Sequence, residues 1–96
     1  MNSTFFCLHA VIDGRVQGVG FRMFVLEKAQ SLNLTGWVRN TISGQVEVYA
    51  EGPRSVLETL LEDLYRGPRG SWVESVQQEW LPGSGEFTSF VVSRTV

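Results

Sequence analysis

Cysteine and histidine are almost absent from this chain, which contains only Cys7 and His9. A single cysteine excludes an intramolecular disulfide and a cysteine-based zinc site, and a single histidine excludes a histidine-rich metal site. His9 also lies inside an apolar run that is typical of a strand, so a Ser-His-Asp triad is not indicated. We therefore expect no bound metal and no cofactor.

Long apolar stretches are also missing, because no run approaches the roughly 18 residues that a membrane-spanning helix needs. Met1 to Thr4 include no basic side chain, and the apolar run that follows stops at Asp13, so the start of the chain does not resemble a signal peptide. We expect a soluble cytoplasmic protein with no membrane partner.

Charge is sparse as well, since 19% of the residues are charged against a usual ~25%, and the net charge is −2. Lys28 is the only lysine among the eight basic residues, so arginine, whose planar fork suits phosphate and carboxylate groups, carries nearly all the positive charge. Without a broad basic surface, nucleic acid is not an expected partner. With 96 residues, 43% of them hydrophobic, the chain has room for one core, and we expect residues 1–96 to form a single monomeric domain.

The apolar pattern predicts alternating strands and helices. Residues 5–13 form the first strand, and one of its faces should meet the helices because all four of its residues are apolar: Phe6, Leu8, Ala10 and Ile12. A helix with an apolar stripe follows from Phe21 to about Leu34. The remaining elements are expected as strands at 37–41, 45–50, 73–80 and 87–93, and as a second helix that begins at Pro53 or Ser55 and ends at Gly67.

The resulting order, β-α-β-β-α-β with a short extra strand, is that of the split βαβ plait. Two helices of this size can cover one face of one sheet. We therefore predict an α+β fold, a ferredoxin-like plait (βαββαβ) with two helices on one face of an antiparallel sheet of four to five strands. In this plait the first two strands run parallel, with the third between them.

A glycine-rich loop, Gly14-Arg15-Val16-Gln17-Gly18-Val19-Gly20, joins the first strand to the first helix. Three glycines in seven residues permit dihedral angles at which successive backbone N–H groups point inward and bind an anion. The helix N-terminus favours a nearby anion by roughly 0.3–1 kcal/mol. Arg22 lies in the first helical turn, where the dipole disfavours a cation unless an anion is near, and its fork can reach an anion held by the loop.

Asn40 is expected beside this loop. The first two strands end at the same edge of the sheet, and Asn40 ends the second strand on the face of Val38, opposite to that of Arg39. Its carboxamide can donate to one atom and accept from another, which suits the holding of a water molecule. Taken singly, these residues also have ordinary structural explanations: glycines in a tight turn, a solvated arginine and an asparagine that begins a hairpin turn.

Two segments together resemble the signatures of the acylphosphatase family. The first is Ile12-Asp13-Gly14-Arg15-Val16-Gln17-Gly18-Val19-Gly20-Phe21-Arg22. The second is Gly36-Trp37-Val38-Arg39-Asn40, followed by Gly44, Val46 and Gly52. The order of elements also matches from Phe5 to Val92, so the resemblance covers nearly the whole chain.

The resemblance implies a hydrolase that converts acyl phosphates to a carboxylate and inorganic phosphate, without a metal or a covalent intermediate. It also implies that Arg22 and Asn40 are catalytic: Arg22 binds the phosphoryl group, Asn40 orients the attacking water and Thr41 supports the asparagine. The implied phosphate-binding residues are Arg15, Val16, Gln17, Gly18, Val19, Gly20 and Arg22.

Two other functions fit parts of the sequence. Plaits of this kind also bind RNA through aromatic residues on the open sheet face, where Phe5 and Trp37 are expected, but the chain has only eight basic residues and no RNA-recognition signature. The other is a related domain that binds anions without turnover, which the presence of both Arg22 and Asn40 argues against. Trp72 and Trp80 lie outside both signatures and are expected to pack or to line a rim.

Overall fold

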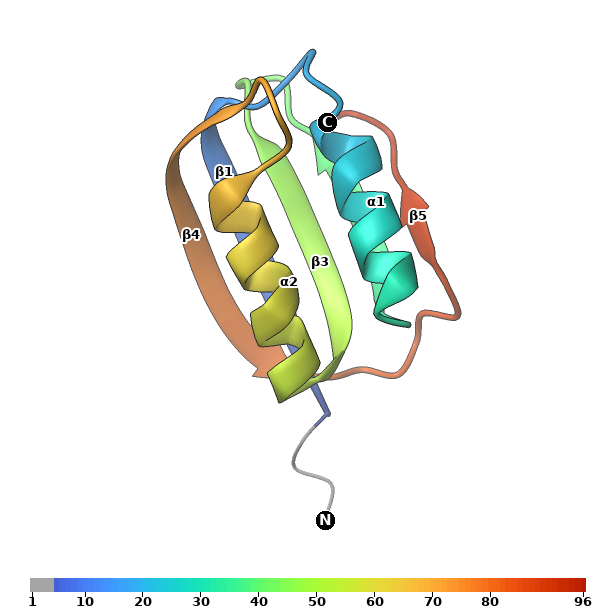
Figure 1. Cartoon of the computed structure of the whole chain (residues 1–96). Coiled ribbons are helices and arrows are strands. Elements are labelled where there is room, and N and C mark those ends of the chain that lie inside the picture. Colours follow the sequence, from blue (N-terminus) through green and yellow to red (C-terminus); the bar gives the residue numbers. More distant parts are fainter. Residues whose placement is uncertain (1–4) are drawn as a thin grey trace.

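A computed structural model describes residues 5–96 and shows seven elements of secondary structure in them (Figure 1). They are β1 (Phe5–Arg15), α1 (Phe21–Ser31), β2 (Thr35–Asn40), β3 (Val46–Pro53), α2 (Arg54–Arg66), β4 (Trp72–Pro82) and β5 (Phe90–Val92). Residues 1–4, on which the expectation about a signal peptide partly rests, lie outside the described residues. Between residues 5 and 96, neither helix is long and apolar enough to cross a membrane.

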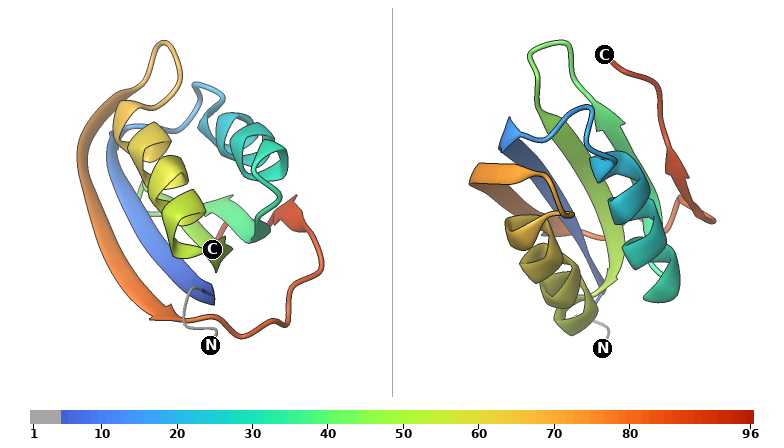
Figure 2. Two further views of the ribbon diagram at one scale, coloured as in Figure 1. Left: turned by 60° about the horizontal axis from the view of Figure 1, so that its bottom comes forward. Right: turned by 45° about the horizontal axis from the view of Figure 1, so that its top comes forward.

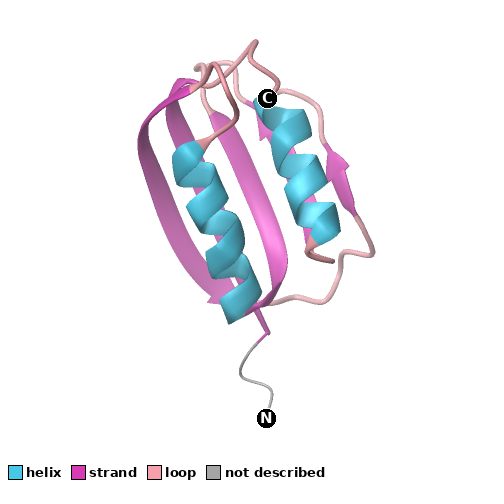
Figure 3. Ribbon diagram, viewed as in Figure 1, coloured by secondary structure: helices cyan, strands magenta, loops and turns pink. Residues whose placement is uncertain are grey.

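The five strands form one sheet in the order β4-β1-β3-β2-β5. β3 lies between β1 and β2 and is antiparallel to both, so β1 and β2 run parallel, as predicted. Both helices cover the same face, α2 over the side of β1 and β4, and α1 over the side of β2 and β5 (Figures 1 and 2). Figure 3 shows both helices in front of the strands, on one face of the sheet, and the predicted ferredoxin-like plait is confirmed.

The sheet is mixed rather than wholly antiparallel as predicted, because β5 pairs with β2 in parallel register. β4 ends beside the start of β1, at the lower edge of the sheet in Figure 1, and the next segment crosses below the sheet to its far side. β5 therefore enters the sheet from the same end as β2 and runs in the same direction. This register places Val92 opposite Val38.

The core lies between the sheet and the two helices. The predicted apolar face of β1 contributes to it, with Leu8, Ala10 and Ile12 fully buried and Phe6 half-buried at its margin. The helices bury residues at intervals of three and four: Phe21, Val25 and Ala29 from α1, and Leu57, Leu60 and Leu64 from α2. Each large apolar side chain buried in this way stabilises the fold by about 1.5–3 kcal/mol, and together they hold the N-terminus of α1 against the sheet.

α1 ends at Ser31, earlier than predicted, because the chain makes a left-handed turn at Asn33, where φ is 59°. The N–H of Leu34 donates to the carbonyl of Ala29 over 2.9 Å, and the N–H of Asn33 donates to the carbonyl of Gln30 over 3.1 Å. This is a Schellman motif with asparagine in the place that glycine usually occupies. The turn buries Leu34 and leads the chain directly into β2.

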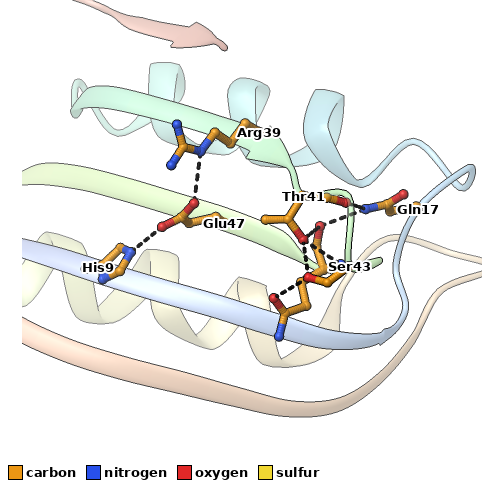
Figure 4. Close-up of polar contacts among 7 residues, drawn as sticks. His9, Gln17, Arg39, Thr41, Ser43 and Glu47 are labelled. Atoms are coloured by element: carbon orange, nitrogen blue, oxygen red, sulfur yellow. Dashed lines mark hydrogen bonds and ion pairs between the residues drawn. The ribbon is translucent and has the colours of Figure 1, made fainter. Parts of the chain in front are cut away.

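The open face of the sheet carries a cluster of charged and aromatic side chains around Glu47. One carboxylate oxygen of Glu47 lies 2.6 Å from Nε2 of His9, and the other accepts a hydrogen bond from Nε of Arg39 over 2.9 Å (Figure 4). Burial by itself would raise the pKa of Glu47, but the hydrogen bonds from His9 and Arg39 together outweigh burial and hold that pKa below its ordinary value.

Replacement of Glu47 by glutamine should therefore lower the free energy of unfolding at neutral pH and lower it less in acid. A carboxylate whose pKa is lower in the folded state stabilises the fold fully above the unfolded pKa of about 4.3, and this contribution is lost as the pH falls through the lower folded value. Hydrogen bonds to charged groups contribute about 1.5–3 kcal/mol. Urea unfolding of wild type and Glu47→Gln at pH 7 and pH 3 measures the effect, with the exposed Glu62→Gln as the control. An equal difference at both pH values would contradict the prediction.

Candidate active site

A hollow of about 370 Å³ opens at the edge of the sheet where β1 and β2 end. Its lining comes from the loop after β1, the first turn of α1 and the ends of β2 and β5: Val16, Gly18, Gly20, Phe21, Arg22, Met23, Asn40 and Val92. Arg22 is the only charged residue in this lining, and Asn40 is the only carboxamide. As residues 5–96 define it, the hollow offers a small ligand one cation and one amide, a combination that suits an oxyanion.

The strand order brings Arg22 and Asn40 together as predicted. β1 and β2 flank β3 and run parallel, so both end at the same edge of the sheet. Asn40 is the last residue of β2, and Val38, two residues before it, is fully buried beneath the helices. Because side chains alternate along a strand, Asn40 projects to the helix side, where α1 begins.

The glycine loop has backbone N–H groups that lack a hydrogen-bond acceptor among the described residues. It is shorter than predicted, since β1 continues to Arg15, and it contains Gly18 with φ 76° and Gly20 with φ 79°. Within residues 5–96, no N–H group of residues 16–20 donates to a backbone or side-chain acceptor. Such a run of unpaired N–H groups, in a segment with left-handed glycines, is typical of a backbone anion site.

The N-terminus of α1 faces the same hollow and adds to its positive potential. The first turn contains Arg22 and no acidic residue, and the cap residue Gly20 offers no side-chain hydrogen bond. Among the described residues, Arg39, Arg54 and Arg66 each have a carboxylate partner. Arg22 makes no ion pair there, and neither do Arg15, Arg69 and Arg94, which lie outside the lining of this hollow. The helix dipole disfavours a cation at this end, and an anion bound beside Arg22 would offset that cost.

Arg15, predicted to bind phosphate, lies apart from this hollow. It is the last residue of β1, is opposite Trp72 of β4, and lines a second hollow with Gly70, Ser71, Trp72 and Glu74. Trp72 is exposed at the rim of that second hollow, as expected, and Trp80 packs against the guanidinium of Arg54, which lies 3.9 Å from the centre of its ring. The guanidinium of Arg15 therefore does not belong to the lining that contains Arg22.

The other predicted loop residues fall into three groups: two valines, one glutamine and two glycines. Val16 is buried in the core and Val19 is packed against it, so these two side chains anchor the loop to the protein. Gln17 instead turns its side chain towards the turn between β2 and β3 (Figure 4). Only the glycines, which have no side chain, leave the loop open on the ligand side.

Thr41, predicted to support Asn40, closes the turn between β2 and β3. Its N–H donates to the carbonyl of Gln45 over 2.9 Å, and its Oγ1 accepts a hydrogen bond from the N–H of Gln45 over 3.1 Å. Oγ1 also lies 2.9 Å from the hydroxyl of Ser43 (Figure 4). The residue after Asn40 is thus held at both its backbone and its side chain.

Three residues of the hollow were not predicted as site residues: Phe21, Met23 and Val92. Phe21 was predicted only as part of the apolar stripe of the first helix. Met23 follows Arg22 in the first turn of α1 and is 53% exposed, an unusual exposure for methionine that no helical periodicity signals. Val92 reaches the site only because β5 pairs with β2 in parallel register. No local pattern in the sequence indicates that register.

Comparison with known proteins finds relatives that match most of this chain. Residues 8–92 match a family model described as Acylphosphatase. A protein of Salinibacter ruber named acylphosphatase is 48% identical over 85 residues, which cover 88% of this chain and 90% of that protein. A protein of the same name from Pseudomonas aeruginosa is 49% identical over 88 residues, which cover 92% of this chain and 96% of that protein.

Solved structures show the same similarity in three dimensions. The structure of an acylphosphatase from Coxiella burnetii matches with a TM-score of 0.89 and 38% sequence identity, and the match covers 97% of this chain and 100% of that one. The chain is therefore similar to these proteins over nearly its full length, including both segments that line the hollow.

Proposed function

We propose a mechanism from the premise that this chain belongs to the acylphosphatase family and is an enzyme that hydrolyses acyl phosphates. In this mechanism a water molecule oriented by Asn40 attacks the phosphorus atom directly, while Arg22 and the glycine loop hold the phosphoryl group. The products are a free carboxylate and inorganic phosphate.

The phosphoryl group binds by its oxygen atoms. The N–H groups of residues 16–20 and the N-terminus of α1 donate to these oxygens, and the two-pronged guanidinium of Arg22 binds them from the helix side. These donors are in place before the substrate arrives, so they stabilise the charge that is spread over the phosphoryl oxygens in the transition state without reorganisation.

The water molecule binds at Asn40, whose carboxamide oxygen accepts one of its hydrogen bonds and whose NH₂ group donates to a phosphoryl oxygen or to the water oxygen. The new bond forms between the water oxygen and phosphorus, and the bond between phosphorus and the carboxylate oxygen breaks. The leaving group takes the electron pair as a carboxylate, and the protons of the water pass to the product phosphate and to solvent. Because the transition state is loose and the carboxylate leaves readily, little is gained from a general base.

The observation that carries this proposal is the position of Arg22 at the start of α1, in one hollow with Asn40 and without an ion pair among residues 5–96. The test is to measure hydrolysis of acetyl phosphate and benzoyl phosphate by the purified protein. The assays are repeated with excess chelator and with increasing concentrations of inorganic phosphate. We expect turnover that the chelator leaves unchanged and that phosphate inhibits competitively, because phosphate occupies the phosphoryl site. Activity that only a divalent cation restores, or purely noncompetitive inhibition by phosphate, would contradict the mechanism.

The glycine loop can be tested with Gly18→Val. Gly18 has φ 76° and no atom within 4 Å of an added Cβ, so valine would fit the space but resist the dihedral angle, at about 1–3 kcal/mol. The side chain would also stand on the ligand side of the loop. We expect turnover and phosphate affinity to fall tenfold or more while the fold persists, as measured by kinetics, calorimetric phosphate titration and thermal melting.

Gly85→Val is the matched control, because Gly85 has φ 74° and equally open space but lies in the segment between β4 and β5. It should lose a similar amount of stability and keep its phosphate affinity. If both variants bind phosphate as wild type does, the loop is not the anion site.

A further inference from the structure

The side chain of Gln17 connects two parts of the site that are distant in the sequence, the glycine loop and the turn between β2 and β3. It extends from the glycine loop to the turn between β2 and β3, and it is half-buried there (Figure 4). Its Nε2 donates to the carbonyl of Thr41 and to the carbonyl of Gln45, each over 2.8 Å. A primary amide nitrogen has two hydrogens, so each carbonyl receives one of them and both donors are used.

The two carbonyls stand at the two ends of the turn. The carbonyl of Gln45 also accepts from the N–H of Thr41 over 2.9 Å, and the carbonyl of Thr41 accepts from the N–H of Gly44 over 3.1 Å. Gln17 therefore completes a small network that already holds the turn closed. Because Thr41 follows Asn40 directly, the attachment point of Gln17 is one peptide bond from the residue proposed to hold the water.

Other contacts fix Asn40 to the sheet but not to the loop. On one side β2 pairs with β3, where Asn40 is opposite Val46. On the other side the N–H of Val96 donates to the carbonyl of Asn40 over 3.3 Å. Within residues 5–96, Gln17 is the only residue of the loop with a hydrogen bond to β2 or to the turn that follows it.

We propose that Gln17 is a positioning residue that fixes the separation between the phosphoryl group in the glycine loop and the water at Asn40. The inference rests on the proposed function. Direct displacement at phosphorus requires the attacking and leaving oxygens to lie in line, and a misplacement of about 1 Å can lower the rate by 10²-fold. Phosphate in the ground state needs only the loop and Arg22, so loss of the Gln17 link should affect turnover far more than phosphate binding.

The variant that tests this is Gln17→Met, which keeps the length and volume of the side chain and removes both donors. We expect kcat for acetyl phosphate to fall by tenfold to a hundredfold, while the dissociation constant of inorganic phosphate changes less than threefold. The control is Gln78→Met, because Gln78 on β4 also donates from Nε2, to the hydroxyl of Tyr65, and lies away from the hollow. The control should keep the kcat of wild type. An equal loss of kcat and of phosphate affinity in Gln17→Met would overturn the inference, because it would show that Gln17 shapes the loop itself.

A double-mutant cycle with Asn40→Ala shows whether Gln17 acts through Asn40. If it does, Gln17→Met should lower kcat less than twofold in the Asn40→Ala background, since the water is no longer held. Independent, multiplicative losses would overturn the inference. The cycle also separates the two proposals: an Asn40→Ala variant with full activity contradicts the proposed mechanism, whereas an inactive Asn40→Ala beside a fully active Gln17→Met contradicts only the role of Gln17.

Gln17→Asn serves the same purpose if Gln17→Met does not fold. The shorter amide keeps both donors but cannot reach both carbonyls, so the same selective loss of kcat is expected. Unchanged kcat in a folded Gln17→Asn would overturn the inference.

Discussion

Asn40→Ala is expected to lower kcat for acyl phosphates by two or more orders of magnitude and to change the affinity for inorganic phosphate less than threefold. Asn40 is proposed to hold the attacking water, and removal of an interaction made only on the way to the transition state lowers kcat without weakening ground-state binding. Loss of one preorganised polar group in other active sites lowers kcat by about 10²–10³. Steady-state kinetics measures kcat, and calorimetric titration measures the affinity for inorganic phosphate.

The fold of the variant should persist, because Asn40 is half-buried at the mouth of the hollow rather than in the core. A melting curve and near-ultraviolet circular dichroism check this. Asn40→Asp is a second variant of the same shape: its negative charge would repel the phosphoryl group, so both kcat and phosphate affinity should fall. If Asn40→Ala abolished phosphate binding and Arg22→Ala did not, the two roles would be reversed.

Arg22→Ala should weaken phosphate binding and turnover together. Hydrogen bonds to a charged group contribute about 1.5–3 kcal/mol, which corresponds to a loss of about tenfold to a hundredfold in phosphate affinity. Turnover should fall at least as far, because Arg22 also aligns the phosphoryl group for attack by the water in the transition state. Phosphate titration and kcat/KM measure the two effects, and Arg22→Lys, which keeps the charge without the fork, should recover only part of the loss.

The same variant should be no less stable than wild type. Arg22 is exposed, makes no ion pair among the described residues and lies where the helix dipole disfavours a cation, so its removal should leave the melting temperature unchanged or slightly raised. Lys28→Ala is the matched control, because Lys28 lies in the last turn of the same helix and its loss changes the net charge equally. If Lys28→Ala weakened phosphate binding as much as Arg22→Ala, the effect would be one of net charge and not of a site at Arg22.

Much of the site could be predicted from short segments of sequence. The alternation of β1 indicated which of its faces meets the helices, and the alternation of β2 placed Asn40 on the same face as the buried Val38. The glycines of the loop and the arginine at the start of α1 indicated a place for an anion. The two inferences about strand faces are confirmed, because each depends only on the period of a strand. The anion site stays a prediction that depends on the dihedral freedom of glycine and the polarity of a helix end. The family and the type of reaction followed from the two signatures and are confirmed by the relatives.

Contacts between distant segments decided the rest. Val92 lines the hollow because the segment after β4 crosses to the far edge of the sheet. Glu51 holds that segment in place by accepting hydrogen bonds from the N–H groups of Ser84 and Gly85. Arg15 lines the second hollow rather than the one with Arg22, because β1 extends further beside β4 than its own pattern shows.

The sequence by itself determined the order of the elements, the apolar faces of β1, β2 and both helices, and the glycine at which the loop ends, because these depend on neighbours along the chain. Only the tertiary structure decided the direction of β5 and the hydrogen-bond partners of the Gln17 side chain. An amide on an exposed loop can donate to many acceptors, and the two carbonyls that it reaches come within 2.8 Å only after β2 and β3 have paired and closed their turn. That position depends on strand register, which is set by the packing of the whole core and not by any segment of the chain alone.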